Sequence, residues 1–272
     1  MKLFHGIVTY NRLDYLKMHI ESWIKTHDTS HEWRLVIADD GSTDGTVEYL
    51  NQLKIAGVTI SVIFNSRRGP HHQVNTLLLE CSKQPFDMAF IAEDDTYFIR
   101  SGWDNLYADA INLSGYQHLC YFNKQWVLNQ YGVTFHESTK STLLPDKKVQ
   151  SQVSAFPSMG CFWTVTPDVL TNVGYFDLQN LGVSGNGHTD YTIRCCKAGF
   201  NTESVLFDAY QSEKYIAMQD EGYHQSLFSD GSIDVNLIGV PNNKHKGNNI
   251  AKTIYCGYNE CKFNMLNQLV GD

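Results

Sequence analysis

The chain has 272 residues, 42% hydrophobic and 18% charged, a composition typical of folded globular proteins and not of disordered ones. Its formal net charge is -8 and its Lys/Arg doublets at 67–68 and 147–148 are isolated, so nucleic acid is not an expected partner. No apolar run approaches the ~20 residues of a membrane span, and the first residues do not resemble a signal peptide. Seven cysteines without a C-x-x-C pair indicate reduced thiols, so we expect a cytoplasmic protein.

The first hundred residues alternate short apolar runs with helical patterns, which predicts βαβ units and a mainly parallel sheet. Strands are expected at 3–8, 35–38, 58–64 and 88–92, with helices at 13–25, 46–53 and 73–81. These elements predict one α/β domain, whose first half is placed at 1–103.

The pattern weakens after residue 100. Residues 129–152 are expected to form an irregular loop or a small hairpin, 161–165 a strand, and 189–197 a helix that Gly199 ends. We assign 104–210 to the second half of the domain and 211–272 to a C-terminal extension.

Polar or glycine-containing segments follow all four strands of the first half, at 9–12, 39–42, 65–69 and 93–95. In open α/β sheets, ligands bind outside the carboxyl ends of the strands. The four segments therefore predict a single site at one edge of the sheet.

Three adjacent carboxylates, Glu93, Asp94 and Asp95, form the sharpest of these features. They raise one another's pKa unless a cation neutralises them. Neighbouring side chains of a strand point in different directions, so one carboxylate can hold Mg²⁺ or Mn²⁺ while another meets a sugar hydroxyl. A solvated acidic turn is the alternative.

The segment 39–45, Asp-Asp-Gly-Ser-Thr-Asp-Gly, allows three interpretations. The segment could be a plain turn that caps a helix, or a loop that binds calcium. In the third interpretation, one of its carboxylates accepts hydrogen bonds from a nucleotide base or ribose. The calcium loop is rejected, because Asn51 stands where a bidentate glutamate is needed and a strand precedes the loop.

Three segments resemble the GT-A glycosyltransferases of the family 2 type. They are Ile-Val-Thr-Tyr-Asn-Arg (7–12), Val-Ile-Ala-Asp-Asp-Gly-Ser-Thr-Asp-Gly-Thr (36–46) and Ile-Ala-Glu-Asp-Asp (91–95). The resemblance covers about residues 3–103 and resumes at 159–163, 173–177, 190–194 and 197–199. It implies the GT-A fold, in which helices flank a Rossmann-like sheet, and the transfer of a sugar from a nucleotide-sugar, expected to be a UDP-sugar, with inversion.

The resemblance also implies roles for individual residues. Thr9, Tyr10 and Arg12 would line the nucleotide pocket, and Asp39 would bind the uracil edge with Asp40 beside it. Arg67 or Arg68 would lie near ribose or diphosphate, and His71 and His72 are further candidates there. Glu93 and Asp94 would approach ribose or donor sugar, and Asp95 would hold Mn²⁺ or Mg²⁺.

The catalytic base departs from the family pattern, which has Glu-Asp just before the last helix. Here His188 stands at the position of that aspartate, and Asp190 lies two residues further on. Either can deprotonate an acceptor hydroxyl, although Asp190 can also act only as a helix cap. His224 is the candidate for a second metal ligand, preferred over His245.

We therefore predict a metal-dependent glycosyltransferase. Its acceptor is open among a cell-surface polysaccharide, a lipid-linked glycan, a protein side chain and a modified nucleobase, the first two favoured by analogy. The rivals are a sugar-nucleotide nucleotidyltransferase and an inactive sugar- or nucleotide-binding module. Segments 129–152 and 241–249 are candidate lids. Four aromatic residues are candidates for a platform on which an acceptor sugar stacks: Trp103, Trp126, Phe162 and Trp163. For most of them, packing in the core is the favoured role.

Overall fold

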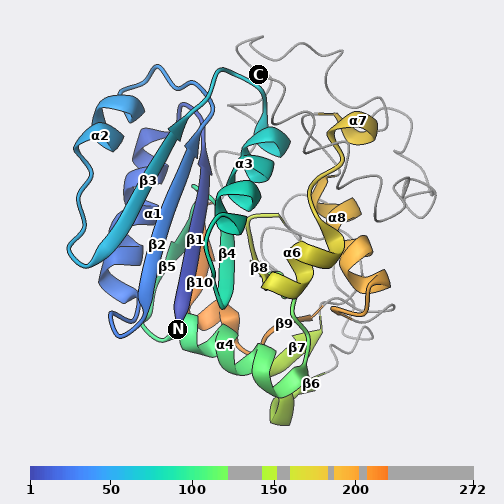
Figure 1. Cartoon of the computed structure of the whole chain (residues 1–272). Helices are drawn as coiled ribbons and strands as arrows, with labels where there is room; N and C mark the ends of the chain where they lie inside the picture. The colour runs from blue at the N-terminus through green and yellow to red at the C-terminus, as the bar shows by residue number, and fades with distance from the viewer. Residues whose placement is uncertain (122–142, 152–159, 183–186, 202–206, 220–272) are drawn as a thin grey trace, which may run out of the picture.

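The computed structural model describes residues 1–121, 143–151, 160–182, 187–201 and 207–219. A five-stranded sheet with the order β3-β2-β1-β4-β8 forms its centre (Figure 1). These strands are β1 (Lys2–Thr9), β2 (Glu32–Asp39), β3 (Val58–Phe64), β4 (Met88–Glu93) and β8 (Phe162–Val165). The first four strands are parallel and β8 runs antiparallel to β4.

Helices connect and cover the strands. They are α1 (Leu13–Thr26), α2 (Thr46–Gln52), α3 (Pro70–Ser82), α4 (Trp103–Ser114), α6 (Pro167–Val173), α7 (Leu178–Leu181) and α8 (Gly187–Lys197). A two-stranded sheet pairs β5 (Thr96–Phe98) with β10 (Ile216–Met218). A three-stranded sheet contains β6 (Leu143–Leu144), β7 (Val149–Ser151) and β9 (Phe207–Ala209).

Alternating side chains of the parallel strands feed two hydrophobic cores, because successive residues of a strand point to opposite faces. Leu3 and Ile7 of β1 pack with buried residues of α1 and α4 on one face. Phe4 and Val8 pack with α3, α6 and α8 on the other face. The result is a three-layer α/β/α arrangement, with helices on both sides of the sheet (Figure 1).

The sequence prediction of a mainly parallel α/β sheet flanked by helices is confirmed. All seven elements expected in the first hundred residues are present, with ends that differ by at most three residues. Helices α4 and α6 were not predicted. The hairpin β6–β7 falls within the expected loop or hairpin at 129–152, and the rest of that segment, like 241–249, lies outside the described residues.

The candidate aromatic platform is part of the core. Trp103 and Phe162 are fully buried, and Trp163 exposes 2% of its surface. Trp126 lies outside the described residues. The three described rings therefore pack inside the protein and present no face to an acceptor.

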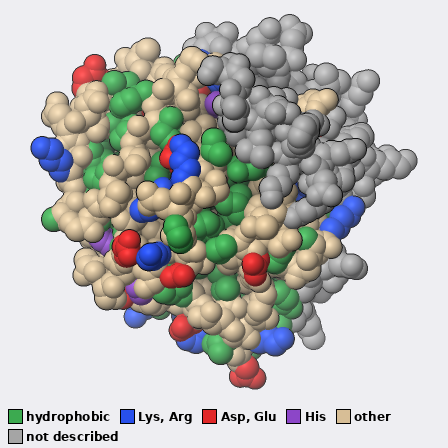
Figure 2. All heavy atoms as spheres, in the orientation of Figure 1, with side chains coloured by type: hydrophobic (Ala, Val, Ile, Leu, Met, Phe, Trp, Pro, Cys, Tyr) green, Lys and Arg blue, Asp and Glu red, His purple; other side chains and the backbone are tan. Residues whose placement is uncertain are grey.

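The described residues include no helix long and apolar enough to cross a membrane. Five cysteines in this part of the chain are free thiols, and four of them are buried. Figure 2 shows the charged side chains of one face singly or in small mixed groups.

A pair of histidines lies inside the core between β1 and α1. His5 and His19 are fully buried, and their Nε2 atoms are 2.8 Å apart, so one ring donates a hydrogen bond to the other. The rings of Trp23 and Phe98 pack against this pair. Burial lowers the pKa of His19 to about 4 and lowers that of His5 as well.

Acid is therefore expected to destabilise the fold through this pair. An unfolded histidine titrates near pH 6.5, so the unfolded state binds protons first as the pH falls from about 6.5 to about 4, and stability is lost over that range. Between pH 7 and pH 5, His19 alone should cost about 2 kcal/mol of unfolding free energy.

Urea denaturation of the wild type and of His5→Leu/His19→Leu at the two pH values measures this effect. The double variant should show a smaller loss between pH 7 and pH 5, although His118 still contributes because burial also lowers its pKa to about 4. An equal loss in both proteins would contradict the assignment.

Candidate active site

The ends of three neighbouring strands bring the predicted donor residues to one edge of the sheet. Thr9 of β1 is paired with Asp39 of β2, and Val8 is paired with Glu93 of β4. Asp94 and Asp95 follow Glu93 directly and are each 2% exposed. The parallel register therefore builds the edge that the sequence predicted.

Arg12 neutralises two of the carboxylates. Its guanidinium nitrogens lie 3.0 Å from Asp94 Oδ1 and 3.1 Å from Asp95 Oδ2. Thr9 Oγ1 donates to Asp94 Oδ2 at 2.7 Å. Asp95 Oδ1, in contrast, is buried and has no hydrogen-bond partner in the described part of the chain.

Burial and mutual repulsion make these carboxylates hard to ionise. Burial raises the pKa of Asp95 to about 7, with Glu93 adding to the effect, although Arg12 opposes it. Burial likewise raises the pKa of Asp94 to about 6. Burial lowers the pKa of Arg12, but the two aspartates outweigh it and the net shift is upward, so Arg12 stays charged. The cluster therefore favours a cation beside it.

Asp39 has one carboxylate oxygen engaged and one open. Its Oδ2 accepts hydrogen bonds from the backbone N–H groups of Gly41 (3.1 Å) and Ser42 (3.0 Å). Gly41 has φ 84°, a conformation that suits glycine. Asp39 Oδ1 is buried, and no described residue hydrogen-bonds to it. This oxygen fits an N–H donor of a bound base.

Asp40 is the anchor of the loop that follows β3. It accepts hydrogen bonds from the backbone N–H groups of Arg68 (2.7 Å) and Gly69 (2.9 Å), and from the side chains of Arg67 and Gln73. These contacts hold the loop at the start of α3. They place Asp40 beside Asp39 but engage it within the protein.

The Tyr10 ring and the Arg67 guanidinium are stacked, with 3.4 Å between the guanidinium carbon and the ring centroid. Arg68 donates to Ser66 Oγ (3.3 Å) and His72 Nε2 (3.3 Å). Two arginines thus border the edge that holds Asp39.

Asp44 connects the starts of two helices. Its carboxylate accepts from Leu13 N at the start of α1 (2.9 Å) and from Thr46 at the start of α2. Asn11 (φ 49°) is fixed to the same loop through Ser42 and Thr43. The helix-capping interpretation therefore describes this part of the segment.

His188 reaches the carboxylates from the far side of the site. It lies in the first turn of α8, and its Nε2 is 3.4 Å from Glu93 Oε1. Its Nδ1 is buried and has no hydrogen-bond partner among the described residues. Desolvation raises the pKa of Glu93, but the hydrogen bond and charge of His188, together with the charges of Arg12 and His71, lower it, and the net shift is downward.

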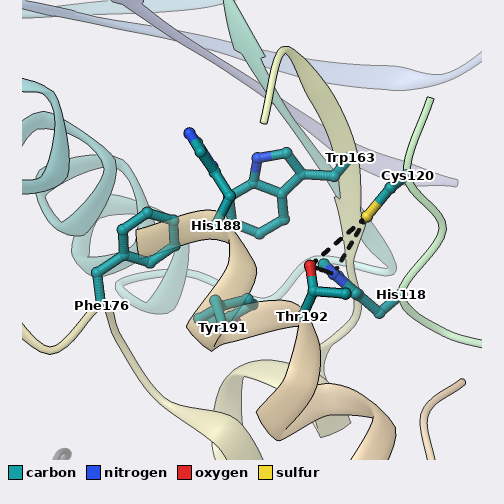
Figure 3. Close-up of a pocket in the computed structure, with 7 residues that line it drawn as sticks. All are labelled: His118, Cys120, Trp163, Phe176, His188, Tyr191 and Thr192. Carbon is teal, nitrogen blue, oxygen red and sulfur yellow. Dashed lines mark hydrogen bonds between the residues drawn. The ribbon is translucent and has the colours of Figure 1, made fainter. Parts of the chain in front are cut away.

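Glycine at position 160 makes room for this histidine. A Cβ atom there would lie 2.0 Å from the His188 ring, far inside van der Waals contact. On its other side the His188 ring meets Phe176 edge-on, with centroids 5.4 Å apart. Figure 3 shows His188 between Phe176 and Trp163. The clash that a Cβ at position 160 would make with His188 explains the glycine there.

Asp190 is directed into the protein. It is 6% exposed, and its Oδ2 accepts from Arg194 Nε at 2.8 Å. The other Arg194 nitrogens donate to the carbonyls of Val173 and Tyr175, both at 2.8 Å. Asp190 is thus one half of a buried ion pair that fixes α8 to the end of α6.

Buried polar residues of α3 support the site, and two of them, Gln73 and Asn75, were not named from the sequence. Gln73 binds Asp40, Asn75 exchanges hydrogen bonds with the backbone of Phe176, and His71 Nε2 accepts from Gly187 N (3.3 Å). His71, a candidate for the donor side, contacts the start of α8. Polar residues within an otherwise apolar helix face were the available signal.

A small pocket lies behind His188 (Figure 3). His118 donates from Nδ1 to Thr164 O (3.0 Å), so its Nε2 accepts from Thr192 Oγ1 (3.0 Å) and lies 3.3 Å from Cys120 Sγ. Burial raises the pKa of the Cys120 thiol, so the thiol stays protonated. The cluster supports α8 and offers no nucleophile.

The side chains of the site supply some, but not all, of the ligands that a hard divalent cation needs. Asp95 supplies a buried carboxylate oxygen without a partner, and oxygen ligands are those that Mg²⁺ and Mn²⁺ prefer. No group of three potential ligands converges within the described residues, and the candidate ligand His224 lies outside them. Asp95 therefore fits one protein ligand of an ion completed by other oxygens.

Residues 6–110 match the family described as Glycosyl transferase family 2. A protein of Acanthamoeba polyphaga mimivirus described as "Uncharacterized glycosyltransferase R363" is 25% identical over 200 residues, which are 73% of this chain and 71% of that protein.

Solved structures share the fold at low sequence identity. Staphylococcus aureus TarS 1–349 in complex with UDP-GlcNAc has a TM-score of 0.55 and 17% identity, covering 82% of this chain. Mannosyltransferase PcManGT of Pyrobaculum calidifontis, in complex with GDP-Man and Mn²⁺, has a TM-score of 0.54 and 15% identity, covering 77%. This chain spans 60% and 55% of those two chains. Residues 6–110 thus resemble family 2 glycosyltransferases, and the chain has the GT-A fold that these solved structures share.

Proposed function

We propose that this protein transfers a sugar from a nucleotide-sugar, a UDP-sugar in the first instance, to an acceptor hydroxyl with inversion. One observation carries the proposal: His188 meets Glu93 at 3.4 Å, on the edge that also holds Asp39 and Asp95. A candidate base and the candidate donor residues thus share one site.

We assign the donor's nucleotide to the ends of β1, β2 and β3. Asp39 Oδ1 would accept from the N–H of uracil, with the Tyr10 ring nearby. Arg67 and Arg68 would face ribose or diphosphate oxygens, because guanidinium groups bind such oxygens well. The complexes of TarS with UDP-GlcNAc and of PcManGT with GDP-Man support a nucleotide-sugar donor.

His188 is the proposed general base and Asp190 is not. The carboxylate of Glu93 would stabilise the imidazolium that forms when His188 takes the acceptor proton. Asp190 is engaged by Arg194 within the core. The acceptor oxygen, freed of its proton, would attack the anomeric carbon on the face opposite the departing nucleotide.

Asp95 would hold a divalent ion, Mn²⁺ or Mg²⁺, which when bound offsets negative charge on the departing diphosphate. The Mn²⁺ in the PcManGT complex supports this cofactor. The buried Asp95 Oδ1 is the oxygen we assign to it. His224 stays a candidate for a further ligand.

The acceptor class stays open between a polysaccharide, a lipid-linked glycan, a protein and a modified base. The buried positions of Trp103, Phe162 and Trp163 remove them as a stacking surface, so an aromatic platform does not support any of these acceptors. Acceptor libraries tested with the matching donor would identify it.

Thermal unfolding with UDP, GDP, dTDP or CMP, each with Mn²⁺ or with EDTA, tests the donor site. A nucleotide at about 100 times its Kd adds about 2.7 kcal/mol, which raises Tm by about 5–10 °C in a chain of this size. We expect this rise with UDP and Mn²⁺, and its loss in EDTA and in Asp95→Ala.

Two results would decide against the proposal. No shift with any nucleotide would remove the donor site. A shift without turnover on any acceptor, and without donor hydrolysis, would instead favour a binding module.

A further inference from the structure

The place expected for a metal ion is contacted by a cation of the protein itself. Arg12 ion-pairs with Asp94 Oδ1 (3.0 Å) and Asp95 Oδ2 (3.1 Å), and its side chain is 14% exposed. The same Asp95 carries the buried unpartnered Oδ1. One carboxylate thus has one oxygen taken by arginine and one open.

A divalent ion and the Arg12 guanidinium cannot both lie close to Asp95 without repulsion. Two cations a few ångströms apart in a buried site interact strongly, because little water screens them. Their repulsion is relieved if Arg12 moves toward a different anion. In a glycosyltransferase site, the diphosphate of the donor is such an anion.

The surrounding contacts allow the side chain to move while the backbone stays fixed. Asn11, which precedes Arg12, donates its backbone N–H to Ser42 Oγ (2.8 Å). Its side-chain Oδ1 accepts a hydrogen bond from Thr43 N (2.7 Å). The guanidinium carbon lies 4.4 Å from the Tyr15 ring centroid, and Arg12 Nε has no partner among the described residues. The aspartates and one aromatic face are thus what hold the guanidinium.

We propose that Arg12 is an internal counter-cation that competes with the divalent ion for Asp95. In the metal-free enzyme it neutralises Asp94 and Asp95. Donor diphosphate draws it away, and the ion then binds Asp95 tightly, so that metal and nucleotide bind cooperatively. The diphosphate part of this inference rests on the proposed function, whereas the competition between Arg12 and the ion does not.

Binding of Mn²⁺ alone, measured by electron paramagnetic resonance, tests the competition without activity or nucleotide. Arg12→Gln is expected to bind Mn²⁺ at least about tenfold more tightly than the wild type, equivalent to about 1.4 kcal/mol. Arg12→Lys keeps the charge but not the forked contact and should fall between them. Arg100→Gln removes the same charge from an exposed residue outside the site and should leave the affinity unchanged.

Arg12→Gln leaves buried carboxylates uncompensated and can lower stability. Circular dichroism establishes that it is folded, and Mn²⁺ should raise its Tm more than it raises that of the wild type. If Arg12→Gln is unfolded without metal, the Arg12→Lys comparison carries the test. Equal or weaker Mn²⁺ binding in the Arg12 variants, including no binding to any of the proteins, would overturn the proposal.

A second set of titrations with UDP separates this inference from the proposed function. UDP is expected to tighten Mn²⁺ binding by a larger factor in the wild type than in Arg12→Gln. The same factor in both proteins would overturn the coupling through Arg12. If UDP does not bind the wild type at all, the proposed donor fails, while the measurement with Mn²⁺ alone still decides the competition.

Discussion

Replacing His188 by glutamine is expected to lower the rate of sugar transfer by about 10²–10⁴-fold, the range associated with loss of a general base. Glutamine can still donate a hydrogen bond to Glu93 but cannot take a proton. The donor contacts lie on other residues, so donor affinity and Tm should change little. Steady-state kinetics and a thermal melt in the presence of donor nucleotide measure both quantities.

Asp190→Asn is the matched control, because it alters the competing candidate base two residues away. This variant is expected to lose stability, and to keep its rate per folded molecule within about tenfold of the wild type. If instead the folded Asp190→Asn protein loses about 10²-fold or more while His188→Gln stays active, Asp190 is the base.

Replacing Arg194 by methionine is expected to lower the free energy of unfolding by about 3–5 kcal/mol, because it leaves the buried Asp190 carboxylate unpaired. The variant also removes the donors to the carbonyls of Val173 and Tyr175. Urea denaturation monitored by circular dichroism gives the value.

Two further proteins test the physical cause of this loss. Arg194→Met/Asp190→Asn should be less destabilised than the sum of the single variants, since no unpaired charge remains buried. Lys25→Met removes a pair of the same i,i+4 spacing, Lys25 with Glu21, whose side chains are 73% and 62% exposed. Its stability should hardly change. A small effect of Arg194→Met would show that water reaches Asp190.

Local sequence patterns were sufficient for the elements of the sheet. The hydrophobic run at 3–8 and the helical spacing at 13–25 depend on neighbours in the chain, and both elements formed as predicted. The edge that carries Asp39 and Glu93 followed from the rule that parallel strands end on one side. Helices α4 and α6 were not predicted, because the alternation of apolar runs and helical spacing weakens after residue 100.

The sequence was a weaker guide to side chains whose contacts lie far away along the chain. His71 and His72 were candidates for the donor side; His72 lies beside Arg68, and His71 contacts the start of α8. Trp163 was a candidate for an acceptor-stacking platform, yet it is only 2% exposed. Such positions depend on how α3, α6 and α8 cover one face of the sheet, which no local period encodes.

The sequence by itself determined the α/β class, the order of the first strands and helices, and the group of carboxylates at the end of β4. Those features arise from periodicity and chain order. Only the tertiary structure decided that His188 meets Glu93, that Asp190 pairs with Arg194, and that Arg12 contacts Asp95. The first and third contacts join segments far apart in the chain. Asp190 and Arg194 lie four residues apart on one face of α8, and it is the burial of this pair that packing decides.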